Sequence, residues 1–200
     1  MAITNYTTLQ AAIGNWLARA DLTAEIPDFI AMAESEMDQK LRCQYNESSA
    51  STAISSGVIA VPTGYMAMKA CYIDKAEPVY LEPKTLSFIL QEYPSNNSGE
   101  PRFFARRTTD FVFGPYPDSN YTIQQYFYKK LDIATDTTNS VLTNARDVYL
   151  YGSLYHAAIF TGEGEKEQRW GNKFWATMNA LNEGEIRNSV SGGPIAAAVG

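Results

Sequence analysis

The sequence predicts an α+β protein in which N- and C-terminal helices pack as a bundle beside a central antiparallel β region with one inserted helix. Apolar residues recur at helical spacing near both ends of the chain. The middle instead consists of short β-prone runs separated by Gly, Pro, Ser and Asn. We therefore expect the bundle over residues 1–45 and 144–188, the β region over 46–130, and a flexible C-terminal arm over 189–200.

The segment from Asn144 to Thr161 predicts the helix around which the fold is organised. Asn144 is a suitable N-cap, Asp147 favours the first turn, and Gly162 is suited to end the helix. Apolar residues between these signals cover nearly every side of the expected helix. Such a helix must be buried on several sides. We expect it to lie in one core, or half in a core and half in a subunit interface.

The N-terminal residues predict a helical hairpin. Asn5 is the expected N-cap of the first helix, and Pro27 fits the first position of the second, where its missing N–H costs nothing. The second helix should bury one stripe and carry its acids largely elsewhere. The expected stripe is Ile30, Ala33, Met37 and Leu41, and the acids are Asp28, Glu34, Glu36 and Asp38.

The β region should begin with a hairpin. Its two strands would be Ser48–Ile54 and Val58–Val61, joined by Ser55-Ser56-Gly57. Further strands are expected over 66–73, 79–81, 102–106, 110–113 and 121–128, with a helix over 84–92. The polar run from Thr135 to Asn139 predicts an exposed loop, and a last long helix should run from about Gly164 to about Asn188.

Charge and composition limit the classes of function. The chain carries 22 acidic and 16 basic residues, a net charge of −6, which argues against a protein built to grip nucleic acid. Passive contact with DNA remains compatible, since a like-charged wall lets DNA slide. Cys43 and Cys71 form no metal-ligand pattern. Without a leader or a long apolar run, the sequence predicts a protein made in a reducing cytoplasm and not inserted in a membrane.

No catalytic constellation emerges, and we expect no catalytic, cofactor-binding or metal-binding residues. His156 is the only histidine and has no acid three or four positions away, so a structural or interface role is favoured. Glu34 and Asp38 share a helix face, as paired catalytic carboxylates sometimes do. A solvated acidic face is the favoured interpretation of that pair.

Two aromatic features each allow more than one interpretation. Arg106 and Arg107 follow Phe103 and Phe104, a pattern that could stack bases. The favoured interpretation is a strand with one aromatic face inward and a basic rim. The 13 tyrosines suit protein interfaces as much as cores, because tyrosine offers contact area and a hydrogen bond together.

Several motifs occur in a specific order along nearly the whole chain. They include 26–30 (IPDFI), 113–117 (FGPYP), 147–152 (DVYLYG) and 191–194 (SGGP). Their order and spacing resemble those of the head–tail adaptor, or connector, proteins of short-tailed and related tailed bacteriophages.

The resemblance implies a structural virion protein with no enzyme activity and no cofactor. Such adaptors assemble in the host cytoplasm as a twelve-membered ring beneath the portal protein, extend the channel for genomic DNA, and present a platform to a nozzle or tail protein. The resemblance also implies that the C-terminal arm reaches the portal. The expected partner-binding residues are Ser191, Gly192, Gly193, Pro194, Ile195 and Val199.

Two further functions stay open. One is a tail-associated peptidoglycan-degrading enzyme, for which Glu34 and Asp38 would have to line a cleft. The other is a different tail structural protein, such as a terminator, which would show a different ring number or no affinity for the portal.

Overall fold

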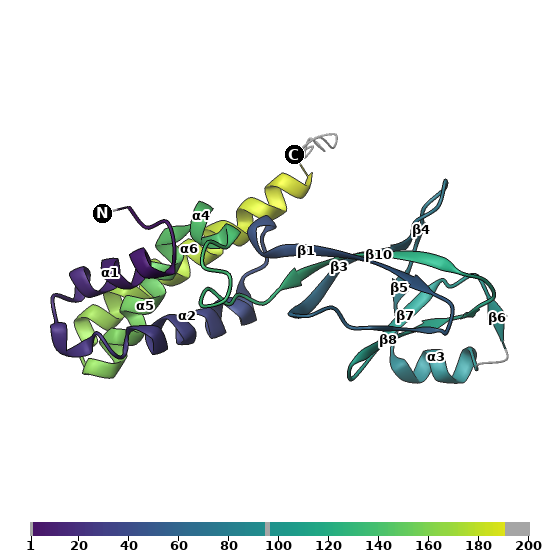
Figure 1. The fold of residues 1–200 in the computed structure, drawn as a ribbon, viewed down its shortest axis with the longest axis horizontal. Helices are drawn as coiled ribbons and strands as arrows, with labels where there is room; N and C mark the ends of the chain where they lie inside the picture. Colours follow the sequence, from purple (N-terminus) through teal and green to yellow (C-terminus); the bar gives the residue numbers. More distant parts are fainter. Residues whose placement is uncertain (1, 95–96, 191–200) are drawn as a thin grey trace, which may run out of the picture. The chain divides into compact units, whose positions relative to one another are not determined.

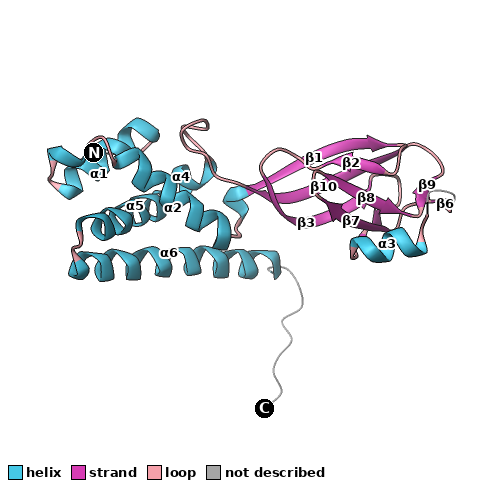
Figure 2. Ribbon diagram, turned by 90° about the horizontal axis from the view of Figure 1, so that it is seen from below, coloured by secondary structure: helices cyan, strands magenta, loops and turns pink. Residues whose placement is uncertain are grey.

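The structure is a computed structural model that describes residues 2–94 and 97–190. It confirms the α+β class (Figure 1). The chain divides into two compact units: Met1–Asn46 with Leu131–Gly200, and Glu47–Lys130. We call them the helical unit and the β unit, because the long helices lie in the first and the sheets in the second (Figure 2). The β unit is one continuous stretch, whereas the helical unit is assembled from both ends of the chain.

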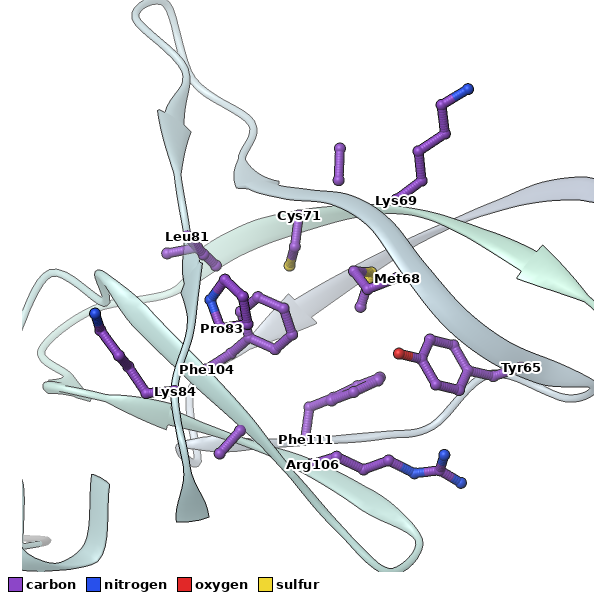
Figure 3. Close-up of a pocket in the computed structure, with 12 residues that line it drawn as sticks. Tyr65, Met68, Lys69, Cys71, Leu81, Pro83, Lys84, Phe104, Arg106 and Phe111 are labelled. Atoms are coloured by element: carbon purple, nitrogen blue, oxygen red, sulfur yellow. The ribbon is translucent and has the colours of Figure 1, made fainter. Parts of the chain in front are cut away.

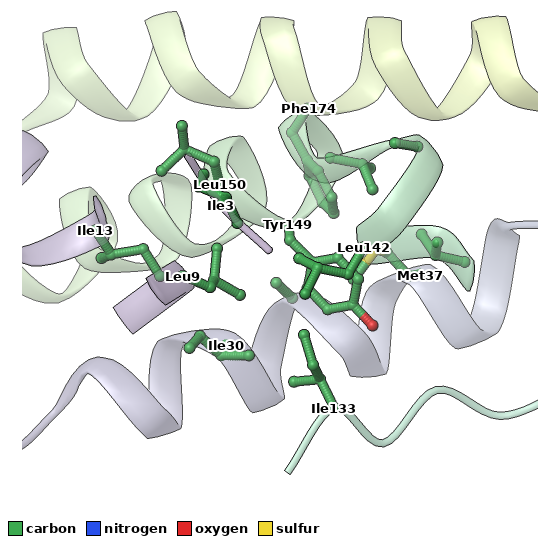
Figure 4. Close-up of a cluster of buried hydrophobic side chains, with 14 of the residues drawn as sticks. Ile3, Leu9, Ile13, Ile30, Met37, Ile133, Leu142, Tyr149, Leu150 and Phe174 are labelled. Atoms are coloured by element: carbon green, nitrogen blue, oxygen red, sulfur yellow. The ribbon is translucent and has the colours of Figure 1, made fainter. Parts of the chain in front are cut away.

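Among the described residues, five α-helices form the helical unit. They are α1 (Tyr6–Leu17), α2 (Ile26–Lys40), α4 (Ser140–Asn144), α5 (Arg146–Thr161) and α6 (Gly164–Val190). α5 packs against each of the other four, which confirms its central place in this core (Figure 4). Asn5 is the N-cap of α1 as expected: its Oδ1 accepts a hydrogen bond from the Thr8 N–H at 2.9 Å.

The start of α5 differs from the sequence prediction. The helix begins at Arg146 after Ala145, which makes no side-chain cap, and Asn144 instead ends the short helix α4. α4 forms because the Asn139 side chain caps it and because Val141 and Leu142 are fully buried. The end of α5 at Gly162 is confirmed, with a left-handed φ of 69°.

The expected buried stripe of α2 is confirmed, since Ile30, Ala33, Met37 and Leu41 are all at most 1% exposed. α2 and α6 meet α5 closely at Gly152. A Cβ added at Gly152 would lie 2.9 Å from the Ala33 Cβ and 2.8 Å from the Phe174 Cε2. Only a glycine therefore fits this position without displacing its neighbours.

The long helix α6 also holds the end of α2. The Asn182 Oδ1 accepts from the Arg42 N–H at 2.7 Å, and its Nδ2 donates to the Lys40 carbonyl at 2.9 Å. The Lys40 ammonium lies 3.9 Å from the centre of the Trp175 ring. α6 runs to Val190, so two residues of the expected arm belong to the helix.

The part of the β unit that the structure describes contains two four-stranded sheets. The first has the order β1 (Glu47–Ile54), β10 (Tyr121–Lys129), β3 (Tyr65–Ile73) and β4 (Val79–Tyr80), and is antiparallel throughout. The second has the order β2 (Val58–Ala60), β8 (Asp110–Gly114), β7 (Phe103–Arg107) and β5 (Glu82–Pro83), with β5 parallel to β7. Short strands β6 (Ser98–Gly99) and β9 (Tyr116–Pro117) pair separately, and helix α3 (Leu86–Glu92) packs on β7 and β8.

The expected hairpin of the first two strands is wrong. β1 pairs with β10 in one sheet and β2 pairs with β8 in the other, so the turn at Ser55–Gly57 carries the chain between sheets. Both strands keep an apolar residue, Ile54 and Ile59, in the shared core. Burial on the common inner face explains this arrangement, which turn length alone could not reveal.

The expected exposed loop at residues 135–139 is wrong at its end. Asn139 is only 8% exposed, and its Nδ2 donates to the Tyr149 hydroxyl at 2.8 Å. Earlier in this segment, the Tyr6 N–H donates to the Thr137 carbonyl at 3.0 Å. The segment is thus attached to the helical core through its polar groups.

The close approach at Gly152 makes a prediction. Gly152→Ala should lower the free energy of unfolding by about 1–3 kcal/mol, because the new methyl group overlaps Ala33 and Phe174. Gly184→Ala on α6 is the matched control, since nothing lies within 4 Å of its added Cβ. This control should raise the free energy of unfolding by up to about 1 kcal/mol through helix propensity. Urea denaturation of both variants measures the two changes, and changes of the same sign would contradict the close approach at Gly152.

Candidate functional site

Glu34 of α2 is buried beneath the segment that returns from the β unit. Its side chain is 9% exposed, and its Oε1 accepts hydrogen bonds from the Ile133 N–H at 2.8 Å and the Tyr149 hydroxyl at 2.9 Å. Burial raises the pKa of the Glu34 carboxyl, and the two donors offset this in part. Glu34 therefore serves as an internal hydrogen-bond acceptor of the helical unit.

Asp38, one turn further along α2, has a similar role. Its Oδ1 accepts from the Leu131 N–H at 2.8 Å. The expectation of a solvated acidic face at Glu34 and Asp38 is therefore wrong, because these carboxylates bind the backbone of the returning segment. Paired carboxylates in glycoside cleavage must instead face a substrate across a cleft.

His156 of α5 finds its acidic neighbour on another helix. Its Nε2 lies 3.7 Å from the Glu36 Oε1 of α2, and its side chain is 11% exposed. Burial lowers the pKa of His156, and the nearby Glu36 carboxylate opposes that shift. Helical spacing along α5 could not reveal this partner, which only the packing of α2 on α5 brings near. The expected interface role of His156 stays a prediction.

The aromatic residues of β7 are covered on both faces. Phe104 is 5% exposed within the core between the sheets, as expected. Phe103 points to the opposite face, where its ring lies 5.7 Å from those of Phe88 and Tyr93. Phe104 is thus closed to a base, and Phe103 is half-buried with two aromatic rings packed beside it. Beyond them, Arg107 pairs with Asp110 at 3.1 Å, and Arg106 lies exposed over the Tyr65 ring.

Large apolar side chains are exposed on α2 and at the end of α5 in the helical unit. Phe160 is 61% exposed, Ile159 45% and Met32 53%. The Phe160 ring lies 5.5 Å from that of buried Phe29, so this side chain is held on the core. We call Met32, Ile159 and Phe160 the helical patch. Clustered exposed apolar side chains often mark a protein interface.

A row of tyrosines lies on the outer face of the first sheet of the β unit. Tyr80 of β4, Tyr72 of β3 and Tyr126 of β10 follow one another, with ring centres 5.5 and 6.3 Å apart. Tyr80 is 69% and Tyr126 39% exposed. Tyrosine at such positions suits protein contacts, because the ring buries area while the hydroxyl stays hydrogen-bonded.

No three His, Cys, Asp or Glu side chains in the described part of the chain gather so as to hold a metal ion. No helix in residues 2–94 or 97–190 is long and apolar enough to cross a membrane. The expected partner-binding residues Ser191, Gly192, Gly193, Pro194, Ile195 and Val199 lie outside the described residues.

Comparison with known proteins gives one match that covers nearly the whole chain. Residues 4–197 match the family model described as SU10 adaptor protein. Among individual curated proteins, none matches the sequence.

The buried carboxyl of Glu34 makes a prediction. Glu34→Ala should lower the free energy of unfolding by about 2–4 kcal/mol at pH 7, because two buried donors lose their acceptor. Glu34→Gln keeps an acceptor oxygen without the charge and should stay within about 1 kcal/mol of the wild type. Urea denaturation of the three proteins measures these differences.

The same experiment has a pH dependence. The folded-state pKa of Glu34 is raised, so ionising it costs stability in the folded protein. The stability of the wild type relative to Glu34→Gln should be greatest below about pH 4 and fall as pH rises through the folded-state pKa. A difference that does not change between pH 4 and 8 would contradict the burial of this carboxyl.

Proposed function

Because the chain belongs to the SU10 adaptor protein family, we propose that it forms a ring at the head–tail junction of a tailed phage virion. The observation that carries this proposal is the family match over residues 4–197, which agrees with the order of motifs in the sequence. In this role the protein docks under the portal protein, extends the DNA channel and presents a platform to a nozzle or tail protein. Its activity is structural.

Ring closure requires two unlike surfaces on each subunit, since every subunit contacts its neighbours head to tail. The helical patch of Met32, Ile159 and Phe160 supports one of these surfaces, because its apolar side chains are exposed in the isolated chain. The tyrosine row of the β unit supports another contact. The net charge of −6 supports a channel that repels DNA and so lets it pass.

The C-terminal arm is our proposed contact to the portal. We take residues 191–200 as this arm; they follow Val190, the last residue that the structure describes. Its glycines, proline and small apolar residues suit a segment that becomes ordered on binding, with the ordering cost met at that moment. Ser191, Gly192, Gly193, Pro194, Ile195 and Val199 are the proposed partner-binding residues.

Light scattering after size exclusion tests the proposal. The protein should be monomeric alone and should add to purified portal rings as about a dozen copies, because contacts that order on docking favour assembly on a template. A variant without residues 191–200 should unfold at the same temperature as the full chain and should not bind the portal. If the full-length protein did not bind portal rings, the adaptor role would be refuted. If the variant without residues 191–200 still bound them, only the proposed contact between the arm and the portal would be refuted.

The helical patch makes a separate prediction about the ring. Phe160→Ser should lower the number of copies added to a portal ring while the protein stays folded, because the side chain is 61% exposed and loses only its ring contact with Phe29. Leu90→Ser is the matched control, since Leu90 is 57% exposed on α3 of the β unit. The same mass measurement compares both variants. If Phe160→Ser added to the portal ring in the same number of copies as the wild type, the helical patch would not belong to the ring interface.

A further inference from the structure

A cavity of about 350 Å³ opens between the two sheets of the β unit (Figure 3). Its walls are mainly apolar and include Met68, Cys71, Leu81, Phe104 and Phe111. Burial raises the pKa of the Cys71 thiol to about 12, so this wall stays uncharged at neutral pH. The volume falls within the range of about 300–1,000 Å³ that is typical of ligand pockets in proteins.

The cavity opens between two strand edges that lack a neighbouring strand. β4 pairs with β3 only at Tyr72 and Ile73, and β5 pairs with β7 only at Phe103 and Phe104. Within the described part of the β unit, no strand therefore pairs with 65–70 on the side of β3 away from β10. The edge of β7 beyond Phe104 is likewise uncovered.

The path of the chain explains the two uncovered edges. The Leu81 N–H donates to the Cys71 carbonyl at 2.9 Å, and the next N–H, of Glu82, donates to the Arg102 carbonyl at 2.9 Å. The chain thus leaves one sheet for the other within a single residue. It then follows β7 only as far as Lys84, whose N–H donates to the Phe104 carbonyl at 2.9 Å, and pairs with neither edge beyond that point. An uncovered edge is a template for a strand from another chain.

At the mouth of the cavity, the guanidinium of Arg106 makes no ion pair with a carboxylate of the described residues. It lies 5.2 Å from the centre of the Tyr65 ring. The neighbouring Lys84 is paired with Glu82 at 3.0 Å, and Lys69 is paired with Glu47. On a chain of net charge −6, this unpaired guanidinium is complementary to a carboxylate of a partner.

We propose that this opening binds an extended peptide segment of another virion protein. The segment adds a strand along the uncovered edge of β3, inserts one bulky apolar side chain into the cavity, and places a carboxylate against Arg106. Backbone hydrogen bonds then supply affinity, while the cavity and the guanidinium supply specificity. The identity of the partner as a virion protein rests on the proposed adaptor function, but the binding chemistry does not.

A defined peptide tests this site on the full-length protein. The probe is a fluorescently labelled peptide of sequence Thr-Val-Asp-Leu-Glu-Val-Thr with blocked ends, followed by fluorescence anisotropy. Binding should be saturable, and Arg106→Glu should weaken it by about tenfold or more, because an attractive charge contact becomes repulsive. Arg102→Glu is the matched control, because this substitution changes the charge by the same amount. Arg102 is exposed and does not line the cavity. The affinity of this control variant should stay within about twofold of the wild type.

Hydrogen exchange followed by mass spectrometry locates the bound peptide. Saturating peptide should slow exchange in residues 65–70 and leave 121–129 unchanged, because β10 is already paired on both sides. If Arg106→Glu unfolds, the wild type is tested against the same peptide with both acids replaced by lysine, which should bind about tenfold more weakly.

Three results would overturn the proposal: no saturable binding at millimolar peptide, equal weakening by the two arginine variants, or protection confined to the outer tyrosine row. None of them depends on portal binding. A protein that fails to join portal rings but binds the peptide in this way would refute the adaptor function and keep the peptide site. A protein that joins portal rings but does not bind the peptide would keep the adaptor function and refute the peptide site.

Discussion

The helical unit depends on the packing of α2 against α5, which brings together residues far apart in the chain, such as Glu34 and Tyr149 at a separation of 115 positions. Ala33 and Gly152 let the helices approach closely, and Phe174 of α6 closes the same contact. Beside it, Glu34 accepts a hydrogen bond from Tyr149 and another from the returning segment. Apolar contact gives this core most of its stability, whereas the buried carboxylate fixes which segment lies against it.

The sequence was most informative where periodicity and burial coincide. The apolar stripe of α2, the cap at Asn5 and the end of α5 at Gly162 are all local signals, and the structure confirms them. Local patterns also predict most of the strand positions. They do not predict the strand partners, because β1 and β2 are adjacent in the chain yet belong to different sheets. Sheet membership depends on which apolar faces meet in space, and no local pattern encodes that.

The burial of polar side chains is a second feature that the sequence alone does not predict. An acid off the apolar stripe of a helix is ordinarily exposed, but Glu34 is buried because the backbone of residues 131–133 arrives from elsewhere in the chain. The helical patch and the cavity of the β unit likewise depend on contacts between segments that are distant in the chain. Their residues were visible in the sequence as ordinary apolar positions, and only the fold separates the exposed Phe160 from the buried Phe29.

The insertion of the β unit into the helical unit has a consequence for folding. α1 and α2 are synthesised well before α5 and α6, so their apolar stripes stay exposed until α5 is available to pack against them. The β unit is continuous, and its closure pairs Glu47 with Tyr128 near its two ends. Folding of the β unit first would thereby shorten the loop that must close when α2 meets α5, which lowers the entropic barrier to completing the bundle. In that order of folding, the sheets would hold α2 near the start of the segment that leads to α5, an effect separate from any contact that they make in an assembled particle.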